Sequence, residues 1–122
     1  MQYPRQTLDR AQRAIRCAPF QPKLFETMRW QSVSLLEIAG TAGVNQQYTQ
    51  RPLAELSAEN ALLWLIQVGV LRREVDGQGL TDSFRLTPLG HQLVTQGQKE
   101  WQPPVWTERI QNALTRRLRL RT

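Results

Sequence analysis

The stretch AENALLWLIQVGVLRREVDGQGLTDSFRLTPLG, residues 58–90, decides the fold of this chain. Its first part, residues 58–68, places apolar side chains around almost the whole circumference of a helix. Such a helix has to be buried on several sides. We therefore expect this helix, capped by Ser57 and ended by Gly69, to form the centre of the core.

A β-hairpin is predicted directly after this helix. Residues 70–75 favour a strand, and Asp-Gly-Gln-Gly at 76–79 is a strong turn signal. The returning strand is expected over 83–87, with Phe84 and Leu86 on one face. Thr87 and Pro88 then provide a capping hydroxyl and a first-turn proline, which predict a further helix to about residue 96.

Upstream of residue 58 the sequence predicts shorter helices. Ser34 caps a helix over 34–40, and the turn at 41–44 follows, in which Gly43 can adopt a left-handed conformation. Pro52 limits the helix expected after that turn. The remaining helices are predicted over 7–18, 23–31, 45–51 and, beyond a linker, 105–119.

Composition narrows the class of protein. The chain has 122 residues, the size of one domain, and a net charge of +6 in which arginine dominates the basic residues. The single Cys17 excludes an intrachain disulfide, and together with the single His91 it cannot build a zinc site. No apolar run approaches the ~20 residues of a membrane span. We expect a cytoplasmic, non-enzymatic protein without cofactor or metal.

The hairpin region resembles the wing of winged-helix proteins. In that family a helix ends at a glycine, two strands form the wing, and a Leu-Thr-Pro-Leu-Gly helix start often follows, as it does at 86–90 here. The resemblance covers residues 34–94. It implies a fold that is mainly α with a small β-hairpin, and functions that include DNA binding, dimerisation and protein docking.

Residues 34–49 also resemble the helix-turn-helix of lactose-repressor-type headpieces. This resemblance implies that the helix after the turn faces the major groove, where amide and guanidinium side chains suit base edges. The implied groove contacts are Asn45, Gln46, Gln47, Gln50 and Arg51. Two features depart from this pattern: Thr49 stands where an aliphatic residue is usual, and Pro52 cuts the presumed recognition helix short. The chain also departs from ordinary winged helices, because the helix over 58–68, the usual reader, has no lysine or arginine.

Basic residues elsewhere give two further candidate contacts. On the wing, Arg72, Arg73 and Arg85 could clamp phosphates, or they could pair with nearby acidic residues. The arginines of the C-terminal tail could contact nucleic acid or an acidic protein, or could simply solubilise a frayed end. These tail residues are Arg116, Arg117, Arg119 and Arg121.

The last predicted helix has an apolar stripe that forms either a dimer interface or a contact with its own domain. The stripe consists of Trp106, Ile110, Leu114 and Leu118.

Taken together, these patterns predict one winged helix-turn-helix domain, 1–122. Its core is expected at about 23–97, with added helices at 7–18 and 105–119. The first functional hypothesis is a regulator that binds double-stranded DNA. The alternative is a winged helix that docks an acidic protein partner or scaffolds a complex. The whole chain is also similar to an uncharacterised cyanobacterial family of small winged-helix proteins, which implies no activity.

Overall fold

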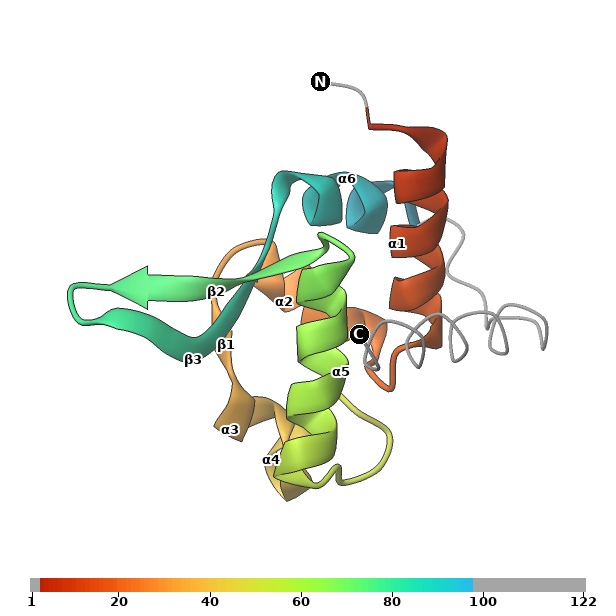
Figure 1. Ribbon diagram of the computed structural model, residues 1–122. Coiled ribbons are helices and arrows are strands. Elements are labelled where there is room, and N and C mark those ends of the chain that lie inside the picture. The colour runs from red at the N-terminus through yellow and green to blue at the C-terminus, as the bar shows by residue number, and fades with distance from the viewer. Residues whose placement is uncertain (1–2, 98–122) are drawn as a thin grey trace.

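A computed structural model describes residues 3–97 of the chain (Figure 1). Within this range the architecture is mixed α/β, with six helices and a small three-stranded antiparallel sheet. In chain order the elements are α1 (Arg5–Cys17), α2 (Pro22–Met28), β1 (Val33–Ser34), α3 (Leu35–Ile38), α4 (Gly40–Asn45), α5 (Glu55–Gln67), β2 (Leu71–Asp76), β3 (Gly79–Leu86) and α6 (Pro88–Gly97). The helix predicted over 105–119 lies outside the described residues.

Helix α5 has the buried position that its composition predicts. Leu62 and Leu65 are fully buried, and Trp64 is almost so. The helix begins three residues earlier than expected, at Glu55, so Ser57 is not its cap. Gly69 follows its end with a φ of +88°, as the stop signal predicted. In Figure 1, α5 stands beside α1 and leads into the sheet, so it forms the centre of the core.

The sheet has one strand more than the predicted hairpin. Its order is β1-β3-β2, with β2 and β3 forming the wing-like hairpin. In the third strand, β1, Val33 pairs with Phe84 and Ser34 with Ser83. Two residues are too few to show the alternation by which a strand is recognised. Strand β1 forms because Phe84 is fully buried and Val33 packs beside it.

Two of the predicted helix starts are confirmed. Ser34 and Glu37 form a reciprocal capping box at α3. At α6 the hydroxyl of Thr87 accepts the N–H of Gly90 at 3.0 Å, and its own hydrogen is shared by the carbonyls of Gly69 and Val70 between α5 and β2. The Thr87 side chain therefore ties α6 to the α5–β2 connection.

The prediction of a turn at 41–44 is wrong. The helix predicted over 34–40 ends at Ile38, and residues 40–45 form α4. Gly43 is helical rather than left-handed, and its lack of a side chain serves a different purpose. A Cβ atom there would lie 1.9 Å from the carbonyl oxygen of Ile38. Glycine is needed because α4 packs directly against the end of α3.

Buried residues from α1, α2, α3, α5, α6 and all three strands form one hydrophobic cluster. Helix α1 contributes Ala11, Ala14 and Ile15, which face α5 and α6. Figure 1 shows α6 crossing beside α1 while the β2–β3 hairpin extends away from the helices. The outer part of the hairpin, the α4–α5 connection and one side of α5 are therefore among the surfaces that the described residues leave exposed.

Candidate binding surfaces around helix α5

The segment 45–51, predicted as a recognition helix, is not helical beyond its first residue. Helix α4 ends at Asn45, and Gln47 has a φ of +65°. The N–H groups of Tyr48 and Thr49 then donate to the carbonyl of Gly43, which closes the turn. The segment turns inward because Tyr48 is buried and its carbonyl accepts the N–H of Gln21 at 2.7 Å. Tertiary packing thus prevents the helix that residues 45–51 suggest.

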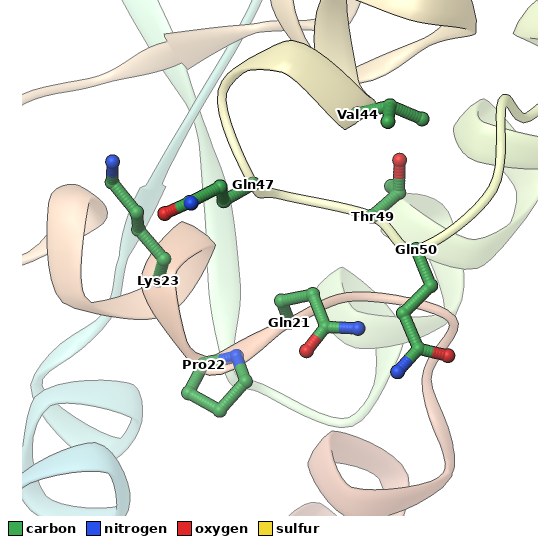
Figure 2. A pocket seen from close by; sticks show the side chains of 7 residues that line it. All are labelled: Gln21, Pro22, Lys23, Val44, Gln47, Thr49 and Gln50. Carbon is green, nitrogen blue, oxygen red and sulfur yellow. The ribbon is translucent and has the colours of Figure 1, made fainter.

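Two of the predicted groove contacts, Gln47 and Gln50, instead line a hollow of about 400 Å³. Figure 2 shows Gln47 on the same side of this hollow as Lys23, and the carboxamides of Gln21 and Gln50 on the opposite side. The lining comes from the start of α2, from the end of α4 and from the segment that follows α4. Its members are Gln21, Pro22, Lys23, Val44, Gln47, Thr49 and Gln50.

A second hollow of about 480 Å³ adjoins the first and shares Gln21, Pro22 and Gln50 with it. Its other lining residues are Arg16, Cys17, Ala18, Pro19, Phe20, Arg51 and Leu53. We call the two hollows together the carboxamide groove, lined by residues 16–23, 44, 47, 49–51 and 53. None of these residues is acidic, so the groove favours an anionic ligand.

Thr49 lies in the wall of this groove. The residue is 3% exposed, and its hydroxyl oxygen has no hydrogen-bond partner among residues 3–97. A Cβ atom on Gly43 would come within 3.1 Å of that oxygen, which shows how closely the hydroxyl packs on α4. A buried hydroxyl without a partner costs about 1–3 kcal/mol relative to an apolar group of the same shape.

Replacing Thr49 with valine is therefore expected to stabilise the fold. Valine keeps the branched shape and removes the unpaired hydroxyl, so the free energy of unfolding should rise by about 1 kcal/mol. For a chain of 122 residues this corresponds to an increase in Tm of about 4 °C. Thermal unfolding followed by circular dichroism measures it, with Thr41→Val on the exposed surface of α4 as control. A lower Tm would mean that the hydroxyl has a partner.

The arginines of the β2–β3 hairpin that were predicted as wing contacts, here called the wing arginines, are mostly occupied by ion pairs. Arg73 contacts Asp82 at 3.0 Å and lies over the ring of Phe84, and Arg85 contacts Glu74 at 3.5 Å. Of the two predicted roles, pairing with nearby acidic residues is thus the one observed for Arg73 and Arg85. Arg72 is exposed and has no such pair within the described part of the chain. One wing cation in three remains available to a phosphate.

The tip of the β2–β3 hairpin is apolar and acidic. Val75 and Leu80 are paired across the two strands, and they are 62% and 74% exposed. Residues 74–82 contain three acidic side chains and no basic one. A wing that contacts nucleic acid is expected to place cations at this position.

The exposed side of α5 is also without cations. Leu56 and Leu63 are 68% and 39% exposed, and Asn60 lies on the same helical face. No lysine or arginine occurs between Arg51 and Arg72. This face has the apolar character of a protein contact rather than of a phosphate contact.

The candidate contacts do not form one continuous surface. Figure 1 shows the α4–α5 connection on one side of α5 and the β2–β3 hairpin on the other. The fold therefore separates Gln47, Gln50 and Arg51 from the wing arginines. The predicted tail contacts Arg116, Arg117, Arg119 and Arg121, and the predicted interface Trp106, Ile110, Leu114 and Leu118, lie outside the described residues.

Two further features are recorded for residues 3–97. None of their helices combines the length and apolarity needed to cross a bilayer. Their histidine, cysteine and carboxylate side chains form no group of three or more that could hold a metal ion.

Comparison with protein-family models matches residues 1–116 to the family described as Npun_F0494-like. The chain belongs to the Npun_F0494-like family. Searches of curated proteins and of solved structures gave no significant match. The match over residues 1–116 confirms the predicted similarity of the chain to a family of its own. It does not support the predicted membership of the winged-helix superfamily. The family's description states no activity, so a function for this Npun_F0494-like protein has to be argued from its own residues.

Sequence reasoning missed two polar groups of the carboxamide groove in this Npun_F0494-like chain. Gln21 and Lys23 stand at the start of α2, where the prolines at 19 and 22 indicated only a break between helices. No local signal places them beside Gln47 and Gln50. Their proximity depends on the Gln21–Tyr48 backbone hydrogen bond, which links segments more than twenty residues apart.

Proposed function

We propose that this Npun_F0494-like protein is a winged-helix module that docks another protein. The order of α3, α4, α5, the β2–β3 hairpin and α6 supports the winged-helix assignment, as does the helix start at 86–90. The proposal retains a cytoplasmic location and the absence of enzymatic activity. The winged helix supplies the scaffold, and the partner class follows from the surface chemistry.

One observation carries the preference for a protein partner: α5 presents leucines instead of cations. In a winged helix the helix before the wing is the one that reads DNA. Binding to a duplex takes much of its affinity from lysine and arginine on phosphates. Here that helix exposes Leu56 and Leu63, while Arg73 and Arg85 on the wing are held by acidic neighbours.

A photo-crosslinking amino acid at position 63 tests this directly in cells. We expect an adduct whose electrophoretic mobility nuclease leaves unchanged, because the exposed face of α5 contacts protein. The same amino acid at Gln31, an exposed position after α2, serves as control and should give little adduct. A nuclease-sensitive adduct at position 63 would contradict the proposal.

Binding of a mixed-sequence duplex tests the competing hypothesis, a DNA-binding regulator, which the net charge of +6 and the unpaired Arg72 favour. At about 150 mM salt we expect that any binding of the duplex is unaffected by Arg72→Gln. The regulator hypothesis prevails if the duplex binds with a Kd below about 1 µM and Arg72→Gln makes that Kd less dependent on salt concentration. Such a result would mean that Arg72 contacts phosphate.

A further inference from the structure

We propose that the carboxamide groove binds an extended acidic segment of a partner protein, with Lys23 and Arg51 each holding a carboxylate. This inference rests on the proposed function only in taking the ligand to be part of a protein. It concerns a different surface, because the groove lies between the start of α2 and the α4–α5 connection rather than on the exposed face of α5.

The charge of the groove favours an anionic occupant. Its two hollows have no acidic lining residue, while Lys23 borders the first and both Arg16 and Arg51 border the second. Lys23 and Arg51 are exposed, and neither forms an ion pair with any residue in the range 3–97. They differ in this from Arg73 and Arg85 on the wing, whose charges are already compensated.

The carboxamides favour a polypeptide as the carrier of that negative charge. The side chains of Gln21, Gln47 and Gln50 line the groove without hydrogen-bonding to any residue that the structure describes. A carboxamide offers both donors and an acceptor, which is also what a peptide group offers. Carboxamides between two cations therefore suit a chain in which peptide groups alternate with carboxylates.

The groove is held in shape before any ligand arrives. The Gln21–Tyr48 backbone hydrogen bond of 2.7 Å joins its two walls, and the ring of Tyr48 is buried beneath them. Gln47 adopts a φ of +65°, an unfavourable conformation for a residue with a side chain. Figure 2 shows that the Gln47 side chain then lies on the Lys23 side of the hollow. A preformed site loses less conformational entropy on binding.

Two free cations and three carboxamides are a weak arrangement for a nucleic acid. Affinity for a polyphosphate grows with the number of phosphates neutralised, and few are neutralised here. Hydrogen bonds to peptide groups do not depend on that number. The observations therefore favour an acidic peptide over an oligonucleotide.

Fluorescence anisotropy with the full chain tests the inference. The probe is a short labelled peptide that alternates glutamate and alanine, and its neutral counterpart has glutamine at each glutamate. We expect the acidic peptide to bind at least about tenfold more tightly than the neutral one. Lys23→Glu and Arg51→Glu should each weaken acidic-peptide binding about tenfold, because each places a carboxylate against the ligand.

Arg72→Glu is the matched control, since it makes the same change in charge at an exposed position outside the groove. We expect it to weaken binding less than about twofold at 150 mM salt, because exposed charges beyond a Debye length are screened. An equal loss in all three variants would attribute binding to net charge and overturn the inference. Equal affinity for the acidic and neutral peptides would do the same.

Competition separates the remaining ligand classes. An unlabelled single-stranded oligonucleotide that displaces the peptide more effectively than unlabelled acidic peptide would identify nucleic acid as the ligand and overturn the inference. Displacement by succinate or inorganic phosphate at peptide-like concentrations would identify a small-anion site and overturn it as well. If Lys23→Glu has no effect while position 63 still crosslinks to protein, the groove inference fails and the docking function stands.

Discussion

Alanine at position 43 is expected to lower the free energy of unfolding by about 3 kcal/mol or more. The new methyl carbon would lie 1.9 Å from the carbonyl oxygen of Ile38 and 2.8 Å from its carbonyl carbon. Both are backbone atoms at the end of α3, and the Ile38 side chain is fully buried. Neither side of the contact can relax by changing a rotamer, so α3 and α4 have to separate. Urea unfolding followed by tryptophan fluorescence measures the loss.

Gly77→Ala is the control for this substitution. Gly77 lies in the turn between β2 and β3, where an added Cβ would meet no atom within 4 Å. We expect its effect to stay within about 0.5 kcal/mol. If Gly43→Ala unfolds at the same urea concentration as Gly77→Ala, the close packing of α3 against α4 is wrong. The turn after α4, which supports the carboxamide groove, would then also be described incorrectly.

Phe84→Ala is expected to cost about 3–5 kcal/mol, the largest side-chain effect in the sheet. Phe84 is fully buried in the middle strand β3, paired with Val33 of β1 on one side and Arg73 of β2 on the other. Removing the ring opens a cavity and takes away the surface over which the Arg73 guanidinium lies, 5.1 Å from the ring centre. Because small domains are stable by about 5–15 kcal/mol, this loss is a large fraction of the total.

Leu80→Ala, on the same strand but 74% exposed, provides the comparison. It should change the free energy of unfolding by less than about 0.5 kcal/mol, because little apolar surface is buried there. Equilibrium unfolding of the two variants in urea gives the difference. Similar stabilities for Phe84→Ala and Leu80→Ala would show that β3 does not form the centre of the sheet.

Local signals sufficed for the second half of the described chain. The apolar circumference of α5 required burial wherever the helix lay. Gly69 acts through its own backbone conformation, and Thr87 acts through its hydroxyl on a backbone N–H three residues later. These are interactions over a few residues, so the pattern of the sequence contains them. The predicted hairpin and the start of α6 were confirmed for this reason, while the start of α5, which has no side-chain cap, moved by three residues.

The segment between Ser34 and Pro52 was predicted less well. Its residues suggest two helices around a turn at Gly43, whereas the structure has a short α3, then α4, and then an irregular segment. The glycine was correctly singled out, but its role is close packing on Ile38 rather than a left-handed turn. A sequence shows that a side chain is missing; it does not show whether backbone conformation or a neighbouring carbonyl requires the absence.

The sequence by itself determined that α5 is buried, that a hairpin follows it, and that arginines accompany that hairpin. Only the tertiary structure decided which charges remain available. It paired Arg73 and Arg85 with acidic neighbours on the β2–β3 hairpin, and it left Lys23 and Arg51 on a groove without acidic residues. Helix and strand patterns repeat over two to four residues, so a sequence displays them. Ion pairs and grooves join residues that are distant along the chain, and only the packing of the core brings these together.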